Sequence, residues 1–286
     1  MHPAKLFRVG ACLLAAALFA GPVGDAPVEL RVLSYNTHGL VGWIAGDDPE
    51  SRFPKISQRL HAYDVVLIQE DWSYHEELVS WAPHEVVERG NGSRLALASL
   101  LPIFGGSGLT TLVRSRDWLL DVGREPYDTC AGWLGGANDC FGTKGFLHVR
   151  LRLPPDRRLD VYQTHLDAGA GPDDQAARVH QLELLTERVA AISGDRALIL
   201  AGDFNLDANL SEQRAALDDF AQGLGLQDSR AAPAPGTAWR QLDYVFYRSG
   251  AQVEIELLEA GEALEFRDAT IPLSDHPALF TRFRIR

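Results

Sequence analysis

The pattern of apolar and polar positions along the chain predicts nine β-strands. They are expected at residues 28–35, 64–69, 108–115, 145–153, 158–165, 197–203, 242–248, 252–260 and 277–286. The turn-forming sequence PPDR at 154–157 separates two of these segments, so we expect them to form a hairpin. Several of the apolar runs end abruptly in an acid, an amide or a histidine, so the strand ends carry candidate functional groups.

Two segments have the periodicity of helices. Residues 48–63 fit one helix, which we expect to be interrupted near Pro54. Residues 172–192 fit the clearest helix, and Asp173 can cap its start. Its apolar residues recur at spacings of three and four, at Val179, Leu182, Leu185, Val189 and Ile192. Many strands with helices between them indicate a sandwich of sheets flanked by helices.

The first 20 residues differ from the rest of the chain of 286 residues. Lys5 and Arg8 precede an apolar run that is too short for a stable membrane anchor, which predicts a signal peptide cleaved within residues 20–26. The sequence VGAC at 9–12 is similar to a lipobox but lies before the apolar run, which argues against lipidation. We therefore expect a secreted or periplasmic protein with no transmembrane segment, and a single domain over residues 27–286, where the loop at 231–238 is too short to separate domains.

Net charge and cysteine content bear on the kind of substrate and on the expected disulfide. The formal net charge is −12, and loss of Lys5 and Arg8 with the signal peptide would make it −14. An acidic surface does not attract polyanions by itself, so a nucleic-acid substrate would need local basic groups or metal ions. In an exported protein, Cys130 and Cys140 are expected to form a disulfide, with two free thiols as the alternative.

Polar residues at the ends of the expected strands form a candidate site. They are Asn36, Glu70, His165, Asp203, Asn205, Asp243, Asp275 and His276. Each one alone could close a turn or face solvent, but if the strand ends converge they make a cavity rich in hard oxygen ligands with two histidines. The sequence has no HExxH, no GxSxG and no complete P-loop. A hard metal, an acid near water and a histidinium are what phosphodiester hydrolysis requires.

The sequences SYNTHG, LIQE, QTHLDAG, AGDFN, LDYVFY and LSDHPAL occur in this order. Together they resemble the motifs of the endonuclease/exonuclease/phosphatase superfamily, which has the deoxyribonuclease-like fold. The resemblance covers essentially the whole mature chain. It implies an α/β fold, a four-layer α-β-β-α sandwich of two mostly antiparallel sheets flanked by helices, with the site at one end. It also implies a monomeric, metal-dependent phosphoric diester hydrolase that uses Mg²⁺, or else Mn²⁺ or Ca²⁺.

The same resemblance implies the metal ligands. Glu70 is expected to be the main ligand, with Asn36 beside it. Asp275 is expected to act as a second metal ligand or as an orienting acid.

The resemblance also implies the catalytic residues. Asp203 is expected to orient or deprotonate the attacking water, and Asn205 to hold a phosphate oxygen. His165 and His276 are expected to flank the phosphate, at least one of them as an acid or a charge stabiliser. Asp243 is expected to pair with His276 and to keep it charged, since a nearby carboxylate favours imidazolium.

One segment bears on the substrate. Where pancreatic-type nucleases carry a tyrosine and a glutamate, this chain has glycines and a serine at 105–108, which leaves the partner of His165 undetermined. The sequence SGL, followed by DCFGTKGFLHVRL at 139–151, is more similar to neutral sphingomyelinases. Lys144 would then supply positive charge near the site, or it would simply lie on a hairpin edge. A phospholipid head group is the favoured substrate, DNA is the alternative, and a catalytically inactive binding module is the third hypothesis.

Two loops are apolar at their tips. Trp43 and Ile44 follow closely after Asn36, and Trp133 and Leu134 lie between the two cysteines. Apolar loop tips with tryptophan are typical of transient contact with a membrane surface. The alternative is that both tryptophans fold back onto the core.

Overall fold

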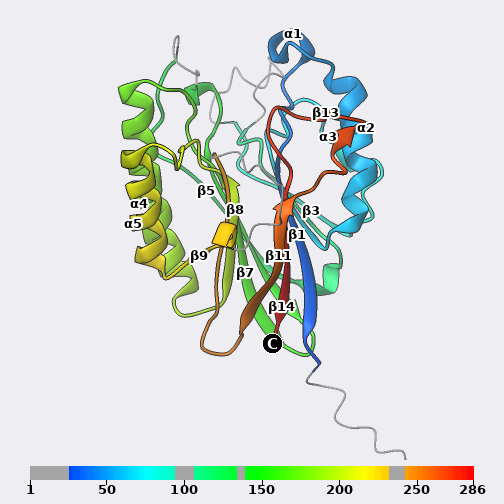
Figure 1. Ribbon diagram of the computed structural model, residues 1–286, viewed down its shortest axis with the longest axis vertical. Coiled ribbons are helices and arrows are strands. Elements are labelled where there is room, and N and C mark those ends of the chain that lie inside the picture. Colours follow the sequence, from blue (N-terminus) through cyan, green and yellow to red (C-terminus); the bar gives the residue numbers. More distant parts are fainter. Residues whose placement is uncertain (1–25, 94–105, 134–138, 232–241) are drawn as a thin grey trace, which may run out of the picture.

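The structure is a computed structural model that describes residues 26–93, 106–133, 139–231 and 242–286 (Figure 1). Several sequence-based expectations lie outside the described residues. They are the signal peptide, Gly105, Leu134 and most of the loop expected at 231–238.

Two six-stranded sheets form the centre of the molecule. The first sheet has the order β11–β14–β1–β2–β4–β3, and the second has the order β5–β6–β7–β8–β10–β9. The strands of the first sheet are β1 (Val28–Asn36), β2 (Val65–Gln69), β3 (Val86–Arg89), β4 (Thr110–Val113), β11 (Ile255–Glu262) and β14 (Leu279–Ile285). Those of the second are β5 (Leu119–Pro126), β6 (Gly145–Leu153), β7 (Arg157–His165), β8 (Leu198–Asp203), β9 (Gln227–Asp228) and β10 (Asp243–Arg248). A separate short hairpin joins β12 (Arg267–Asp268) to β13 (Ile271–Pro272).

Helices cover both outer faces of the paired sheets (Figure 1). The helices are α1 (Gly42–Ala45), α2 (Pro49–Arg59), α3 (His75–Val79), α4 (Pro172–Ser193) and α5 (Ser211–Leu224). One apolar cluster packs α4 and α5 onto the second sheet, and another packs α2 and α3 onto the first. A third cluster fills the space between the sheets, where Val32 and Leu67 meet Val161 and Ile199. These four layers confirm the expected α-β-β-α sandwich of two mostly antiparallel sheets.

All nine expected strands are present, and the PPDR turn does connect the antiparallel pair β6 and β7. The expectation for residues 48–63 was wrong in one respect, because α2 continues through Pro54. Asp48 caps this helix by accepting a hydrogen bond from the Ser51 amide.

The start of α4 also differs from the expectation. Asp173 lies within the first turn, while Asp174 accepts a hydrogen bond from the backbone N–H of Gly171, the residue that precedes the helix. The expected apolar face is largely correct, since Leu182, Leu185 and Val189 are buried. Val179 is exposed instead, beside a groove between α4 and α5.

Strand directions bring the polar ends to one edge of the sandwich. Strand β1 runs parallel to β2, and β7 runs parallel to β8. Strands β10 and β14 run antiparallel to their neighbours β8 and β1, so their first residues lie where the others end. The register pairs Asp203 with His165 on one side and with Asp243 on the other. Residues paired across a sheet point to the same face, so three candidate side chains project together.

Candidate active site

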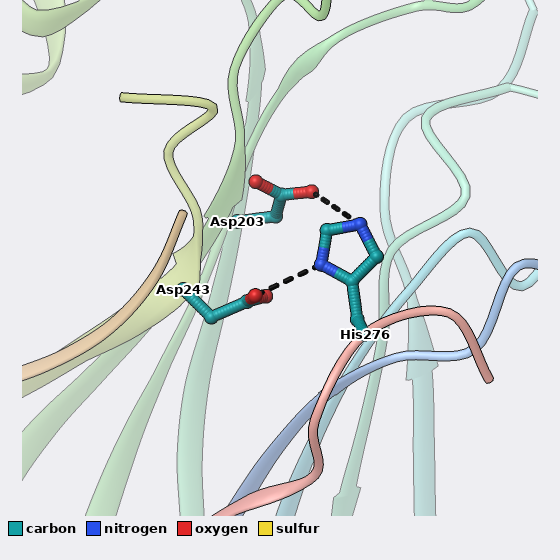
Figure 2. Close-up of side chains that lie close together, drawn as sticks. All are labelled: Asp203, Asp243 and His276. Carbon is teal, nitrogen blue, oxygen red and sulfur yellow. Dashed lines mark hydrogen bonds and ion pairs between the residues drawn. The ribbon is translucent and has the colours of Figure 1, made fainter. Parts of the chain in front are cut away.

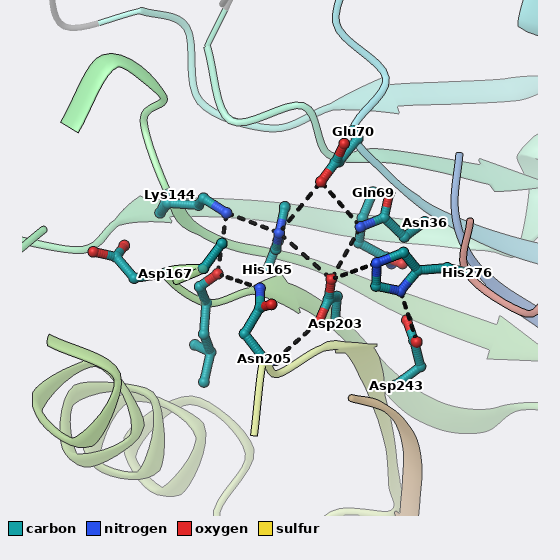
Figure 3. A network of polar contacts seen from close by, with 12 residues as sticks. Asn36, Gln69, Glu70, Lys144, His165, Asp167, Asp203, Asn205, Asp243 and His276 are labelled. Atoms are coloured by element: carbon teal, nitrogen blue, oxygen red, sulfur yellow. Dashed lines mark hydrogen bonds and ion pairs between the residues drawn. The ribbon is translucent and has the colours of Figure 1, made fainter. Parts of the chain in front are cut away.

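A cavity of about 350 Å³ opens at this edge of the sandwich. Five of the candidate residues line it, namely Glu70, Asp203, Asn205, Asp275 and His276. Residues not singled out as candidate ligands or catalytic groups also line it, including His38, Trp72, Asp139 and Lys144. Asn36, His165 and Asp243 lie buried beside these groups and contact them (Figure 3). The structure therefore brings the strand-end residues together.

Three residues around the cavity have backbone conformations that residues other than glycine rarely adopt. His38, Glu70 and Asn205 line the cavity with φ of 50°, 60° and 51°, in the left-handed region. Non-glycine residues in this region concentrate at functional sites, where the surrounding structure holds them in place. At Gly39 a Cβ would lie 2.2 Å from the Glu70 carbonyl oxygen, so only glycine permits this close approach of β1 and β2 ends.

Two carboxylates face each other across one amide. Asn36 Nδ2 donates to Glu70 Oε1 at 3.1 Å and to Asp203 Oδ2 at 3.0 Å (Figure 3). Burial raises the pKa of Glu70, while the Lys144 ammonium and the Asn36 amide partly oppose this rise. A carboxylate withdrawn from water and placed near a second acid gains most from a divalent cation.

His276 lies between two carboxylates (Figure 2). Its Nδ1 is 2.8 Å from Asp243 Oδ2, and its Nε2 is 3.6 Å from Asp203 Oδ2. Burial alone would lower the pKa of His276, but the carboxylates of Asp243, Asp203 and Asp275 outweigh it and raise the pKa to about 10. A pKa this high favours the imidazolium form at neutral pH, and the expected contact between His276 and Asp243 is present.

The second histidine, His165, lies in surroundings that favour its neutral form. Lys144 Nζ donates to His165 Nε2 at 2.8 Å and to the Leu166 carbonyl at 3.0 Å. Burial, together with the cationic Lys144 and His276, lowers the pKa of His165 well below its usual value. A buried, neutral imidazole that accepts a hydrogen bond from an ammonium suits a positioning or phosphate-contacting role better than that of an acid.

The position of Lys144 decides between the two hypotheses for this residue of the DCFGTKG segment. It lies buried at the cavity and not on an exposed hairpin edge. Asp139 Oδ1 lies 3.1 Å from Lys144 Nζ, and Asp139 Oδ2 accepts a hydrogen bond from the Ala168 amide at 2.7 Å. The expected disulfide between Cys130 and Cys140 is present, directly beside Asp139. A cross-linked loop therefore supplies the carboxylate that holds Lys144 against His165.

The glycine-rich segment makes room for an aromatic wall. Gly108 has φ of 67°, and a Cβ at this position would lie 2.5 Å from Trp72 Nε1 and 2.7 Å from Cε2. A Cβ at Gly142 would lie 4.0 Å from Trp72 Cζ2. Trp72 lines the cavity, with its ring centroid 6.3 Å from that of His165. Gly108 thus seats the indole that closes one side of the cavity.

Asp275 and Asn205 lie at the cavity wall with other partners. Ser274 Oγ lies 3.3 Å from Asp275 Oδ1, and His38 Nδ1 lies 3.8 Å from the same oxygen. Asn205 Nδ2 donates to the Leu166 carbonyl at 3.1 Å, and its backbone N–H donates to Asp203 Oδ1. A metal or water role for Asp275, and a phosphate role for Asn205, remain predictions.

The donor set fits a hard divalent cation. Glu70 and Asp203 offer carboxylate oxygens with an amide between them, and Mg²⁺ prefers such oxygen ligands. Asp203, Asp243 and His276 also lie close enough to one another to hold an ion. In that group, however, the imidazole is protonated and both ring nitrogens face carboxylates, so it is better described as an ion-paired acid. The roles expected for Glu70 and Asn36 as metal ligands remain predictions.

The structure defines a class of α/β protein, a four-layer sandwich with acids, amides and two histidines gathered at one end. The chain belongs to the Endonuclease/Exonuclease/phosphatase family, whose model matches residues 33–276. This finding confirms the family resemblance.

Similar proteins support this family assignment. The chain is 31% identical over 276 aligned positions to a sphingomyelinase of Mycobacterium tuberculosis, covering 89% of this chain and 53% of that protein. It is 29% identical to an inositol phosphosphingolipids phospholipase C of Schizosaccharomyces pombe, covering 64% of this chain and 42% of that protein. The chain thus spans about half the length of the curated relatives it matches.

A solved structure has the same fold. The beta toxin of Staphylococcus aureus, as a double mutant with bound magnesium ions, superposes with a TM-score of 0.67 at 15% identity. The match covers 89% of this chain and 99% of that one. At this identity the likeness is evidence for the fold.

Proposed function

We propose that this protein is a divalent-metal-dependent phosphodiesterase that hydrolyses a phosphosphingolipid of the sphingomyelin type. The observation that carries the proposal is the placement of an acid pair and an imidazolium around one cavity. Glu70 and Asp203 lie on one side, and His276 lies 3.6 Å from Asp203 with its proton held by Asp243. This arrangement supports the proposal, because the acid pair would favour a metal ion and a water, and the imidazolium would favour a phosphate.

Each side chain has a role in this reaction. Glu70 and Asn36 would hold Mg²⁺, which when bound neutralises phosphate charge and polarises the phosphorus centre. Asp203 would orient the attacking water and take its proton, and Asn205 would hold a phosphate oxygen. His276 would stabilise the pentacovalent transition state and protonate the departing oxygen. Such a general acid contributes on the order of 10²–10⁴ in rate.

Lys144 and His165 would hold the other side of the phosphate. Lys144 is buried and lies 2.8 Å from His165 Nε2, so its positive charge acts in a site with little water. Asp275 would act as a second metal ligand or orient a water at the cavity rim.

The lipid substrate is favoured over DNA by two observations. The mycobacterial relative that aligns with 89% of this chain is named a sphingomyelinase, and the fission-yeast relative also acts on phosphosphingolipids by its name. Trp43 and Trp133 are 79% and 53% exposed, so they do not fold back onto the core. Ile44, next to Trp43 on the short helix α1, lines the cavity, so the apolar side chains of this helix lie at its mouth. These tips would touch a bilayer surface transiently.

We also propose that the protein acts outside the cytoplasm, as a domain of residues 27–286 released from its signal peptide. The disulfide between Cys130 and Cys140 supports an oxidising compartment. Among the described residues, no helix is long and apolar enough to cross a membrane.

Hydrolysis by the purified mature protein tests the proposal. Sphingomyelin vesicles and plasmid DNA are offered separately with Mg²⁺, and an EDTA-treated sample and an Asp203→Ala variant are the controls. Phosphocholine release that needs metal and Asp203, without nicking, is the expected result. Nicking without lipid turnover would make the protein a nuclease, and no turnover of either substrate would favour a binding module.

A further inference from the structure

Arg52 on α2 joins two loops that carry the candidate active-site residues. Its Nη1 donates to the Thr37 carbonyl at 2.9 Å and to the Leu273 carbonyl at 2.7 Å. Its Nη2 donates to the His38 carbonyl at 2.9 Å and contacts Asp47 Oδ2 at 2.9 Å. One guanidinium thus joins the segment around Thr37 and His38 to Leu273, which lies 221 positions after Arg52 in the chain.

The backbone groups that Arg52 holds are direct neighbours of the site. Thr37 and His38 follow Asn36, at the end of β1, and Leu273 lies immediately before Ser274, Asp275 and His276. A second contact joins the same two loops, because Ser274 Oγ donates to the Asn36 carbonyl at 2.7 Å. The distance between the metal side and the imidazolium side of the cavity depends on how these two loops meet.

The chemistry of the contact requires arginine. The Arg52 side chain is only 11% exposed, and Asp47 balances its charge. Three carbonyls from two directions need a planar fork with several N–H groups, which a guanidinium has and an ammonium lacks. Hydrogen bonds from a charged donor are also stronger than neutral ones, particularly away from water.

We propose that Arg52 is a positioning residue of the active site. It fixes the segment that begins at Asn36, called the Asn36 loop below, against the Ser274–His276 loop. The effect of Arg52 on catalysis rests on the proposed function. The contacts by which Arg52 holds the two segments together, called the clamp below, do not. Weakening the clamp should loosen both loops together, and misplacement of reacting groups by about 1 Å can lower a rate by about 100-fold.

Arg52→Lys tests the proposal, and Arg59→Lys is its matched control. Arg59 lies on the same helix and donates to the Glu265 carbonyl at 2.7 Å, so it ties α2 to the same C-terminal region without touching the Asn36 loop. Both variants keep the charge and lose the fork. Hydrogen–deuterium exchange is measured at the amides of Thr37, Gly39 and Leu273, which donate to backbone carbonyls in the native fold.

In Arg52→Lys, we expect exchange at these amides to rise by about tenfold in both loops, since loss of local contacts lowers the free energy of local opening. With p-nitrophenylphosphorylcholine as a soluble substrate, we expect kcat to fall far more than KM rises. Arg59→Lys should leave kcat and the exchange of Thr37 and Gly39 unchanged, even where both variants lower the melting temperature equally.

Unchanged exchange at Thr37 and Gly39 in Arg52→Lys would overturn the clamp, whatever the activity of the protein. Equal loss of kcat in both variants would assign Arg52 a general structural role and would also overturn it. If the wild-type protein hydrolyses no phosphodiester, the proposed function fails, and the exchange measurement still decides the clamp.

Discussion

The Nδ1 atom of His276 lies 2.8 Å from a carboxylate oxygen of Asp243, although the two residues are separated by 33 positions in the chain. Asp243 begins β10, and His276 precedes β14, so each comes from a different sheet. The pair bridges the two halves of the sandwich and sets the charge of the cavity. The proposed function of His276 as an acid therefore depends on Asp243.

Asp243→Asn should lower kcat by about 100-fold or more, because an amide cannot hold the imidazolium as a carboxylate does. The substitution keeps the size of the side chain but removes one partner of a largely buried ion pair, so we expect the melting temperature to fall, and kcat is measured well below it. Steady-state kinetics on p-nitrophenylphosphorylcholine checks this, with Asp128→Asn as the control. Asp128 contacts an exposed histidine, His180, outside the cavity lining. A variant with unaltered kcat would remove His276 from the proposed chemistry.

Glu70→Gln should weaken magnesium binding. The substitution removes the negative charge that a cation needs while keeping an oxygen in place. Addition of Mg²⁺ should raise the melting temperature of the wild-type protein, because a ligand that binds only the folded state stabilises it. The shift should shrink or vanish in the variant, and calorimetric titration measures the same loss directly. An equal magnesium-induced shift in both proteins would place the metal elsewhere.

The sequence predicts the strands and the polar residues at their ends because both follow from local patterns. Apolar runs with a polar last residue describe β1, β7 and β8 well, and parallel pairing places such ends together. The long apolar repeat at residues 172–192 likewise predicts helix α4. Short elements such as α3 and β3 were missed, since four or five residues carry too little periodicity to distinguish them from loops. The longer helix α5 and strand β5 were missed as well.

The partner of His165 could not be predicted, because it depends on tertiary packing. Lys144 stands just before β6, and only the burial of that strand turns its ammonium inward. The role of Asp139 follows from the cross-linked loop and has no local pattern. Trp72 could have been noticed two positions after Glu70, but its seat depends on Gly108, which lies 36 positions later. Arg52 likewise reads as an ordinary helical residue.

Trp43→Ala should reduce hydrolysis of sphingomyelin in vesicles by about tenfold, since a tryptophan at an interface contributes roughly 1–2 kcal/mol by burial of its ring. Hydrolysis of p-nitrophenylphosphorylcholine should not change. Trp81→Ala is the matched control, because Trp81 is 64% exposed and its amide contacts Ser57, near the other end of α2 from α1. Vesicle sedimentation measures binding separately. If both variants lose vesicle activity equally, Trp43 and helix α1 make no special contact with lipid.

His84 should make the protein sensitive to acid through its fold, independently of the active site. Its side chain is buried, and its Nε2 lies 3.0 Å from the Tyr63 carbonyl. Burial lowers the pKa of His84 from 6.5 to about 4, and the nearby Arg114 adds to the effect, while the Tyr63 carbonyl opposes it. Because the folded state binds this proton more weakly than the unfolded state, the stability is complete above pH 6.5. It is lost as the pH falls from there towards the folded pKa.

This shift predicts a loss of about 3 kcal/mol in the free energy of unfolding between about pH 7 and about pH 4 from His84 alone. His84→Gln keeps a donor for the Tyr63 carbonyl and does not titrate, so the variant should lose less stability over the same range by about that amount. Urea unfolding of both proteins at each pH measures the difference, and the other titrating groups cancel in the comparison. Parallel losses in the two proteins would show that His84 takes up its proton without opposing the fold.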